Sequence, residues 1–472
     1  MANIINKNDI KNKNPWWQNG ENNLIEKDLI YRDLFFTLEK DLKVPMILSI
    51  LGLRRTGKST ILKQLIAKLL NQGVEAKQIF YYLFDEYTNI NTRESLEDAL
   101  NYYLENILEK KVYEINERVY IFLDEIQYIV DWQPVLKKYY DLSNKKIKFI
   151  ITGSQSILLR NKSVETLAGR IFDYYLPPLS FLEFLRAKKV DFVAEIINNK
   201  IDVFAIGKSF KSLEAIDYKY GQKLFDLSKE YILTGQFPEC LSIENGEKKN
   251  TYINESVIGK VIEDITAIYD IDKKENFKIL ANYLFVNSGS LLELKNIAEK
   301  IGLSFISLDK YLDYMKSGYL FKILFKQHKS LIAQGRILKK SYATSSNFIA
   351  AIRNYQTRHF DEVPEVFGHI VETTIFNLLE KNYVSPATLN EIGFWRQGEK
   401  EIDFIVSKDK KQLPLEVKFT NSINNKELST LTAFISDKKL DFGIVVTKNE
   451  LSKKEVAGEE LYFIPAYLFL LI

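Results

Sequence analysis

The most specific chemical signal in the chain is the octapeptide GLRRTGKS, which matches the pattern G-x-x-x-x-G-K-[ST] at every fixed position. Its glycines let backbone N–H groups curl around phosphates, and a helix starting there adds partial positive charge. Lys58 is expected to reach the β- and γ-phosphates and Ser59 to hold Mg²⁺. The alternative is a chance Gly–Lys turn. We therefore expect ATP and Mg²⁺ as cofactors, although the pattern does not separate adenine from guanine, with the nucleotide held by Gly52, Leu53, Arg54, Arg55, Thr56, Gly57, Lys58, Ser59 and Thr60.

A second signal is the apolar run IFLDE, which ends in the adjacent carboxylates Asp124 and Glu125. We expect Asp124 in the Mg²⁺ shell and Glu125 as the residue that orients and deprotonates water, which favours hydrolysis over transfer to a substrate hydroxyl. The alternative is a solvated strand rim. The next apolar run ends in TGSQ, where a polar side chain, Ser154 in our interpretation, is expected to face the γ-phosphate; a plain glycine turn is the alternative.

A third group of charged residues lies near the C-terminus, in the strand-like segments EIDFIV and LPLEVKF. Alternation places Glu416 and Lys418 on one face of a strand, and a hairpin brings Asp403 alongside. Two such acids are able to hold one Mg²⁺ while the lysine stabilises developing negative charge, and Glu372 on the preceding helix is expected as a further ligand. The alternatives are ordinary charges on a half-exposed strand, or a domain that binds without catalysis.

Four short apolar runs and the amphipathic stretches between them must position the first two signals. The runs 46–53, 79–87, 119–126 and 148–154 are rich in β-branched and aromatic residues, which is typical of buried parallel strands. Strand and helix alternate, so we predict an α/β P-loop NTPase sheet with helices on both faces.

The second half of the chain combines a helical stretch, a compact helix–turn–helix pattern and further strands. Helical periodicity dominates from 181 to 285. Within 290–325 a helix, a turn at Gly302, a second helix from Ser304 and a strand give the outline of a winged helix. The predicted recognition helix mixes lysines with aspartates, which favours a packing module over sequence-specific DNA readout.

We divide the chain into five parts, with a boundary predicted at Pro177–Pro178. Residues 1–22 are polar and are expected to form a leader anchored only by Trp16 and Trp17. The remaining parts are the P-loop ATPase core at 23–180, a helical lid or linker at 181–285, a winged helix-turn-helix at 286–345 and a C-terminal α/β domain at 346–472.

Composition excludes several classes of protein. The 472 residues are 46% hydrophobic and 27% charged, which excludes a disordered or fibrous chain. A single cysteine excludes an intrachain disulfide framework, and neither a secretory signal nor a membrane-spanning run is present, so we expect a cytoplasmic protein without a membrane partner. The formal net charge of +3 gives no global field for nucleic acid, so any DNA contact must be local.

Beyond these motifs, the segments LAGR, LPPLSFLEF and LTGQFPE make the chain resemble AAA+-type ATPases of archaea and bacteria. Those ATPases carry a winged helix and a C-terminal domain that resembles restriction endonucleases. The resemblance covers nearly the whole chain, although we find no clear second-sensor arginine after residue 185. It implies a homo-oligomer in which Arg170 of a neighbouring subunit completes the ATPase site; the alternative is a structural pairing of Arg170 with Asp173 or Glu165.

The resemblance also makes the D…ExK residues Asp403, Glu416 and Lys418 candidate catalytic residues of a Mg²⁺-dependent DNA endonuclease. Two hypotheses follow. In the first, ATP hydrolysis moves the winged helix and the nuclease-like domain on DNA. In the second, a slow nucleotide-gated switch recruits protein partners through an inert C-terminal domain. Side chains expected to contact phosphates are Arg396, Lys408, Lys410 and Lys411.

Overall fold

The computed structural model describes residues 7–19, 30–84, 92–154, 167–198, 201–327, 338–362, 364–384 and 391–472. The chain forms two compact units. The first comprises Met1–Pro177 with Ser317–Tyr319, and the second comprises Pro178–Lys316 with Leu320–Ile472. The break thus falls between the two prolines of the predicted boundary, and most of the three parts predicted beyond it belongs to a single compact unit.

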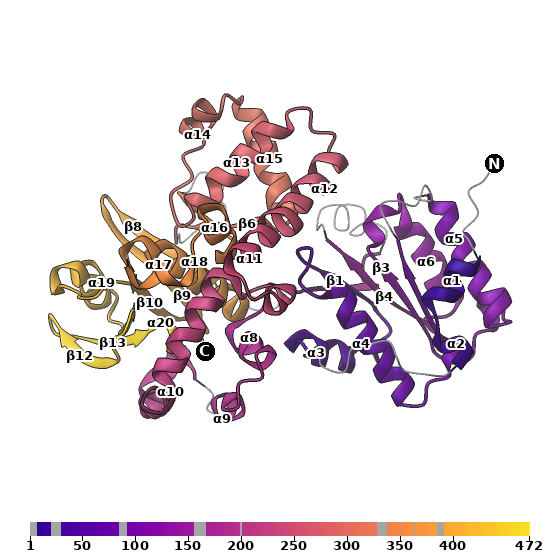
Figure 1. Cartoon of the computed structure of the whole chain (residues 1–472), viewed down its shortest axis with the longest axis horizontal. Helices are drawn as coiled ribbons and strands as arrows, with labels where there is room; N and C mark the ends of the chain where they lie inside the picture. The colour runs from indigo at the N-terminus through magenta and orange to yellow at the C-terminus, as the bar shows by residue number, and fades with distance from the viewer. Residues whose placement is uncertain are drawn as a thin grey trace. The chain divides into compact units, whose positions relative to one another are not determined.

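A five-stranded parallel sheet forms the centre of the first unit (Figure 1). Its strands are β1 (Ile47–Leu51), β2 (Ile79–Leu83), β3 (Val119–Asp124), β4 (Ile147–Gly153) and β5 (Ile171–Tyr175), in the spatial order β2-β3-β4-β1-β5. The four predicted apolar runs are β1 to β4, which confirms the α/β prediction. β5 was not predicted, because it is an edge strand with partly exposed side chains.

Helices cover both faces of this sheet, as Figure 1 shows. One face packs on α5 (Arg93–Tyr102) and α6 (Trp132–Leu142), and the other on α3 (Asp33–Asp41) and α4 (Lys58–Asn71). Alternate strand residues enter the two cores, so that Phe80 belongs to the first and Tyr81 to the second. Both faces are therefore buried, which explains why the strand sequences are continuous apolar runs.

The described part of the predicted leader is docked on the edge strand β2, which corrects the expectation of a loose segment. It forms α1 (Lys7–Lys13) and α2 (Trp16–Asn19). The indole N–H groups of Trp16 and Trp17 both donate to the carbonyl of Ile79, as expected of anchors. Asn14, which was not predicted, donates to the carbonyl of Tyr81 and accepts from its N–H, at 2.8 and 2.7 Å. An amide side chain thus satisfies backbone groups that an edge strand leaves free.

A buried lysine fixes the turn that leads into β1. Lys148 on β4 is fully buried, and its ammonium donates to the carbonyls of Asp41, Val44 and Met46 at 2.6 to 2.9 Å. Arg118 donates to carbonyls of the same turn. Burial, with a smaller contribution from Arg118, lowers the pKa of Lys148 to about 7.

We expect this lysine to make the first unit more stable as the pH rises above 7. The unfolded chain keeps the proton up to a pKa of about 10.4, so between these values the unfolded state binds more protons and the free energy of unfolding increases. From pH 7 to 9.5 the gain is on the order of 3 kcal/mol, and Lys148→Met should lack it. Urea unfolding followed by tryptophan fluorescence measures this, because Trp16, Trp17 and Trp132 lie in the first unit. Equal pH slopes for both proteins would contradict the prediction.

The second unit begins with helices: α8 (Phe181–Ala187), α9 (Val193–Asn198), α10 (Ile206–Thr234), α11 (Gly246–Tyr252), α12 (Lys260–Ile268) and α13 (Lys274–Val286). Then follow α14 (Leu294–Ile301), α15 (Phe305–Ser317) and the antiparallel strands β6 (Phe321–Phe325) and β7 (Lys339–Ala343). Gly302 ends α14 with a φ of 71°, and the hydroxyl of Ser304 accepts from the N–H of Ser307. The order of elements predicted for 290–325 is confirmed.

The C-terminal part holds a six-stranded mixed sheet in the order β12-β13-β11-β10-β9-β8. Its strands are β8 (Glu391–Gln397), β9 (Lys400–Lys408), β10 (Lys411–Lys418), β11 (Gly443–Thr447), β12 (Ser452–Val456) and β13 (Glu459–Pro465). The helices are α16 (Ser346–Arg353), α17 (Thr357–Glu362), α18 (Gly368–Tyr383), α19 (Ser429–Lys438) and α20 (Ala466–Phe469).

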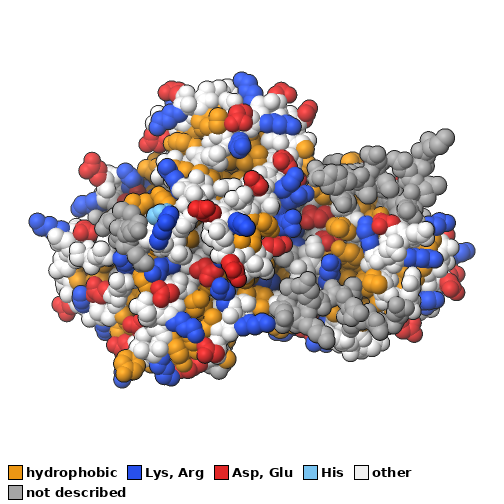
Figure 2. All heavy atoms as spheres, in the orientation of Figure 1, with side chains coloured by type: hydrophobic (Ala, Val, Ile, Leu, Met, Phe, Trp, Pro, Cys, Tyr) orange, Lys and Arg blue, Asp and Glu red, His pale blue; other side chains and the backbone are white. Residues whose placement is uncertain are grey.

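On the face drawn in Figure 2, basic and acidic side chains are interspersed, which fits the small net charge. Among the residues described, none of the helices has the length and apolar character needed to cross a bilayer.

Candidate nucleotide site and C-terminal acidic cluster

The predicted phosphate loop connects β1 to α4, as the mechanism requires. Gly52 has a φ of 153°, and a Cβ there would lie 2.4 Å from the carbonyl oxygen of Leu176, so only glycine fits. Gly57 has a φ of 98° and immediately precedes α4. The loop therefore adopts backbone conformations that depend on its glycines.

Lys58 lies inside this loop. It is 4% exposed, and its ammonium donates to the carbonyls of Gly52 and Leu53 at 3.1 and 2.9 Å. The hydroxyl of Thr56 donates to Leu53 as well, at 2.9 Å. The lysine side chain thus folds back over the loop, where bound phosphates would meet it.

Asp124 ends β3 next to the loop and is fully buried. The hydroxyls of Tyr81 and Thr152 donate to its two carboxylate oxygens, the former at 3.0 Å. Burial and the neighbouring Glu125 raise the pKa of Asp124, whereas hydrogen bonds from Thr152, Ser59 and Tyr81 oppose that rise. The contact with Ser59 places the two predicted Mg²⁺ ligands side by side.

Glu125 follows with a φ of 54°, in the left-handed region. Its N–H donates to the hydroxyl of Thr152 at 2.9 Å. Its carboxylate accepts from the amide of Gln127 at 2.5 Å, and the same amide donates to the hydroxyl of Ser154 at 3.0 Å. Gln127 therefore links Glu125, the predicted water-positioning acid, to Ser154 after β4.

The sheet order explains why these groups meet. β4 lies between β1 and β3, so its end, with Thr152 and Ser154, lies between the phosphate loop and the acidic pair. Because carboxyl ends of parallel strands share one edge, the phosphate loop, the acidic pair and the end of β4 converge there. A hydroxyl and a carboxylate in contact suit Mg²⁺, which takes few protein ligands and completes its shell with phosphate and water. Ser59 and Asp124 would hold the ion.

Two further residues of this region were not predicted. Arg32, just before α3, is 4% exposed and donates to the carbonyls of Thr56 and Pro177, at 2.5 and 2.8 Å. It ties the loop to the segment after β5. Gln127 is the other, and its only sequence signal is a polar residue two positions after the acidic pair.

Arg170 lies at the other end of the sheet. Ile47 donates its N–H to the carbonyl of Arg170, so this residue flanks the start of β1, five residues (about 16 Å) from the loop. Its guanidinium pairs with Asp141 on α6 at 3.0 and 3.2 Å. The alternative partner Asp173 is therefore replaced by Asp141, and Glu165 lies outside the described residues.

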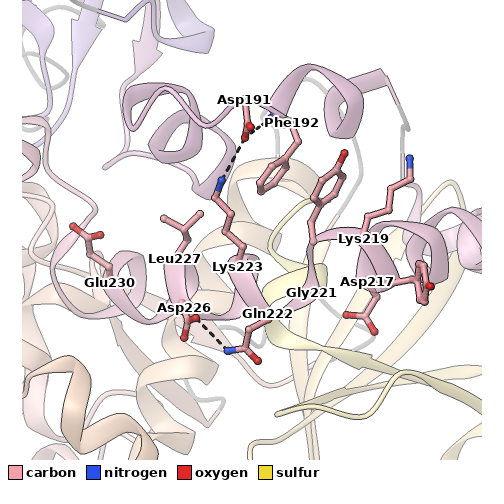
Figure 3. A pocket seen from close by; sticks show the side chains of 12 residues that line it. Asp191, Phe192, Asp217, Lys219, Gly221, Gln222, Lys223, Asp226, Leu227 and Glu230 are labelled. Carbon is pink, nitrogen blue, oxygen red and sulfur yellow. Dashed lines mark hydrogen bonds and ion pairs between the residues drawn. The ribbon is translucent and has the colours of Figure 1, made fainter.

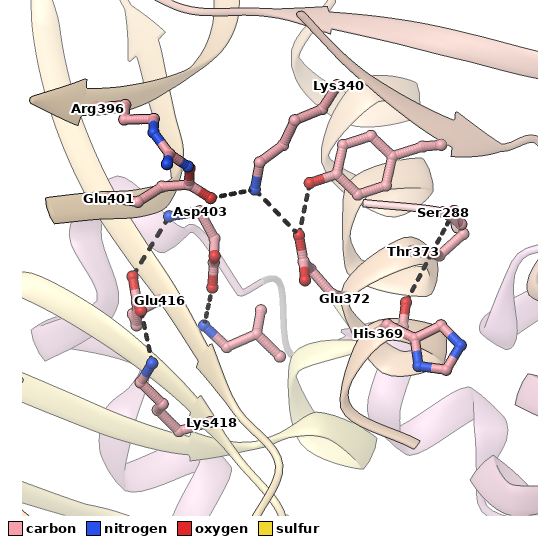
Figure 4. Close-up of polar contacts among 12 residues, drawn as sticks. Ser288, Lys340, His369, Glu372, Thr373, Arg396, Glu401, Asp403, Glu416 and Lys418 are labelled. Carbon is pink, nitrogen blue, oxygen red and sulfur yellow. Dashed lines mark hydrogen bonds and ion pairs between the residues drawn. The ribbon is translucent and has the colours of Figure 1, made fainter. Parts of the chain in front are cut away.

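In the second unit, the D…ExK hairpin forms as predicted (Figure 4). β9 and β10 pair antiparallel, and the N–H of Asp403 donates to Glu416 at 3.3 Å. Lys418 donates to Glu416 at 2.7 Å, and the N–H of Val417 donates to Asp403 at 2.8 Å. Alternation along the strands thus placed all three side chains correctly.

Glu372 joins this cluster from α18, but a lysine comes with it. Lys340 on β7 lies 2.5 Å from Glu401 and 3.7 Å from Glu372, and Tyr342 donates to Glu372 at 2.6 Å (Figure 4). Within the described part of the chain, no three His, Cys, Asp or Glu side chains are arranged to hold a metal. The predicted ligand set of Glu372, Asp403 and Glu416 is therefore not assembled as a metal site.

Burial disfavours the charged forms of the acids in this cluster. Burial and then Asp403 raise the pKa of both Glu372 and Glu416 to about 8, and burial raises the pKa of Asp403. Burial lowers the pKa of Lys340, but the surrounding carboxylates outweigh it and hold that pKa above its usual value. The lysine is thus charged.

The predicted basic turn lines a cavity of about 930 Å³ between β9, β10 and the end of α19. Its lysines are Lys408, Lys410, Lys411, Lys438 and Lys439, and the rings of Phe204 and Phe442 also line it. Arg396, by contrast, pairs with Glu401 at 2.6 Å.

A second cavity of about 750 Å³ lies along α10 (Figure 3). Phe192 and Tyr220 stack there with centroids 4.1 Å apart, and Lys223 pairs with Asp191 at 3.4 Å. Its other charged side chains pair with residues outside the cavity, for example Lys219 with Glu195, and we assign it no ligand.

Three segments of the chain match known protein-family models. Residues 45–185 match a family model described as an AAA domain. Residues 226–344 and 367–469 match models described as domains of unknown function, DUF8612 and DUF4143, which assign no activity. The parallel sheet, the phosphate loop and the AAA-domain match support an ATP-binding domain of the AAA type in this part of the chain.

The chain is also similar to particular proteins. An uncharacterized protein of Haemophilus influenzae is 25% identical over 422 residues, which cover 88% of this chain and 92% of that protein. The uncharacterized protein MJ1637 of Methanocaldococcus jannaschii is 30% identical over 310 residues, or 61% of each chain. The solved structure of the RuvB Holliday junction branch migration motor of Thermotoga maritima is 15% identical, with a TM-score of 0.28. The match covers 63% of this chain and 92% of that chain, and we base no conclusion on it.

Proposed function

We propose that this protein hydrolyses ATP in a Mg²⁺-dependent reaction in which Glu125 positions and deprotonates the attacking water. The observation that carries the proposal is the convergence of Lys58, the Ser59–Asp124 contact and Glu125 at one edge of a parallel sheet. The family match to an AAA domain supports the same chemistry.

Each side chain has a defined role in the reaction. Lys58 binds the β- and γ-phosphates. Ser59 and Asp124 would hold Mg²⁺, which would supply further positive charge. Glu125 takes a proton from water while the water oxygen bonds to the γ-phosphorus and the bond to the ADP oxygen breaks. The proton then passes to the released phosphate. Gln127 keeps the carboxylate of Glu125 in place.

Phosphate release by the full chain tests this proposal directly. We expect hydrolysis of ATP with Mg²⁺ and none with EDTA, and calorimetric titration with ATP and with GTP identifies the preferred base. Folded protein with no affinity for either nucleotide would overturn the proposal.

We further propose that the ATPase acts as a homo-oligomer with Arg170 supplied in trans. In its own chain Arg170 lies at the opposite end of β1 from the loop, so it has no route to its own nucleotide. Its pairing with Asp141 is partly exposed and therefore exchangeable, since such pairs contribute little to stability.

A partner for the ATPase is suggested by the five lysines around the β9–β10 turn. Such a basic cavity with aromatic rings suits the phosphates of DNA. We expect labelled duplex DNA to bind with an affinity that falls as the salt concentration rises. The slope of log affinity against log salt should decrease by about one for each lysine lost in Lys408→Gln, Lys410→Gln and Lys411→Gln. A matched double variant, Lys310→Gln with Lys316→Gln, examines α15 instead. If only the α15 variant weakens binding, the winged helix and not the turn contacts DNA.

The second candidate function is a slow nucleotide-gated switch with an inert C-terminal domain. It is favoured by Lys340, which occupies the acidic cluster. A switch should turn over ATP far more slowly than once per second and should not respond to DNA, so the hydrolysis assay with and without DNA separates the two candidates.

A further inference from the structure

The acidic cluster of the C-terminal sheet is a buried set of charges to which several elements contribute. Its described carboxylates are Glu372 on α18, Glu401 and Asp403 on β9, and Glu416 on β10. Three cations face them: Lys340, Arg396 and Lys418. Nucleases of the type suggested by the D…ExK pattern would place a divalent cation among such acids, so the fit of these residues to a metal decides what the cluster does.

Lys340 brings a positive charge into this cluster. Its side chain is 5% exposed, and its ammonium lies between Glu401 and Glu372, at 2.5 and 3.7 Å (Figure 4). An ammonium at this position repels a second cation, and a metal would have to displace it from a buried ion pair, which leaves the lysine charge without a partner.

The carboxylate oxygens are also engaged by protein donors. Tyr342 and Lys340 share one oxygen of Glu372, and the N–H of Val417 donates to Asp403. Glu416 accepts from Lys418 through one oxygen and from the N–H of Asp403 through the other. Each of these three carboxylates therefore already has a protein partner, and a metal would have to compete with these partners.

We propose that Lys340, paired with Glu372 and Glu401, is an internal counter-ion of this cluster, so that the domain keeps its acids without metal and does not cleave DNA by metal-assisted hydrolysis. This inference is independent of the ATPase proposal, because every residue in it lies in the second unit. It also gives the β6–β7 hairpin a structural role, since β7 inserts Lys340 and Tyr342 into the cluster. Gln327, after β6, donates its N–H to the carbonyl of Phe394 in β8 at 2.8 Å and holds the hairpin against the sheet.

Calorimetric titration of the full chain with MnCl₂, without nucleotide, tests whether the acidic cluster binds a metal ion. We expect no binding that depends on the cluster, so the wild type and Asp403→Asn should give the same isotherm. Any binding lost in Asp124→Asn belongs to the nucleotide site and is subtracted. A wild-type site that disappears in Asp403→Asn would overturn the proposal.

Removal of the Lys340 ammonium tests whether this lysine acts as the counter-ion of the cluster. Lys340→Met should lower the melting temperature by several degrees and bind Mn²⁺, which should restore part of the loss; Mn²⁺ should not shift the wild type. Lys339→Met, at the neighbouring and less buried position, is the matched control. A folded Lys340→Met protein that Mn²⁺ neither binds nor stabilises would contradict the role of Lys340 as the counter-ion of the cluster. If that variant does not fold, the comparison of wild type with Asp403→Asn still decides the proposal.

Discussion

Glu125→Gln is expected to slow ATP hydrolysis by roughly 10²- to 10⁴-fold while ATP binding stays intact, because a positioned general base contributes about that much. Glutamine keeps the shape of the side chain and can still contact Gln127, but it does not accept a proton from water. The phosphate loop, Lys58 and Asp124 are unchanged, so the variant should hold ATP that it cannot hydrolyse.

Single-turnover phosphate release and calorimetric titration with ATP measure the two halves of this expectation. Glu117→Gln is the matched control, since the exposed Glu117 precedes the same strand at its far end, far from the loop, and its side chain accepts a hydrogen bond from Gln78. Wild-type turnover in Glu125→Gln would show that another residue positions the water, and loss of ATP affinity would show that Glu125 has a structural role instead.

The Glu125→Gln variant also tests whether Arg170 acts on a neighbouring subunit of an oligomer. An Arg170→Ala subunit keeps Glu125, and a Glu125→Gln subunit keeps Arg170, so a mixed oligomer contains complete sites only if Arg170 acts on a neighbour. We expect the mixture to exceed either variant alone. A mixture no more active than its components would assign Arg170 to its pairing with Asp141.

The nucleotide site was largely predictable from the sequence because its signals are local. The loop motif specifies a strand before it and a helix after it, and the acids at 124–125 end an apolar run, so a parallel sheet brings them together. The D…ExK hairpin was predictable for a similar reason. Strand alternation with a short turn fixes which side chains share a face, and Asp403 lies beside Glu416 accordingly.

The residues that were not predicted act across long sequence separations. Asn14 caps a strand 67 residues away, and Arg32 contacts a carbonyl 145 residues away. Lys340 is one of two consecutive lysines in an otherwise ordinary strand, and only the packing of β7 against α18 and β9 shows which of them is buried. Propensity and periodicity carry no information on such contacts. The D…ExK pattern therefore predicted the geometry of the acids correctly without revealing the cation that accompanies them.

Lys58→Met is expected to weaken ATP binding by roughly 10- to 10⁴-fold, since one or two charge-assisted hydrogen bonds to phosphate contribute about 1.5 to 3 kcal/mol each. Methionine fills a similar volume in the 4% exposed position but carries no charge. The carbonyls of Gly52 and Leu53 also lose their donor, so a small loss of stability should accompany the loss of affinity.

Calorimetric titration with ATP and Mg²⁺ measures this effect, with Lys63→Met as the matched control because Lys63 is exposed on the same helix, α4. The control should bind ATP as the wild type does, and any effect common to both variants reflects helix α4 rather than the phosphates. If Lys58→Met binds ATP within about threefold of the wild type, which is less than about 1 kcal/mol, the nucleotide does not sit in this loop and the mechanism built on it is wrong.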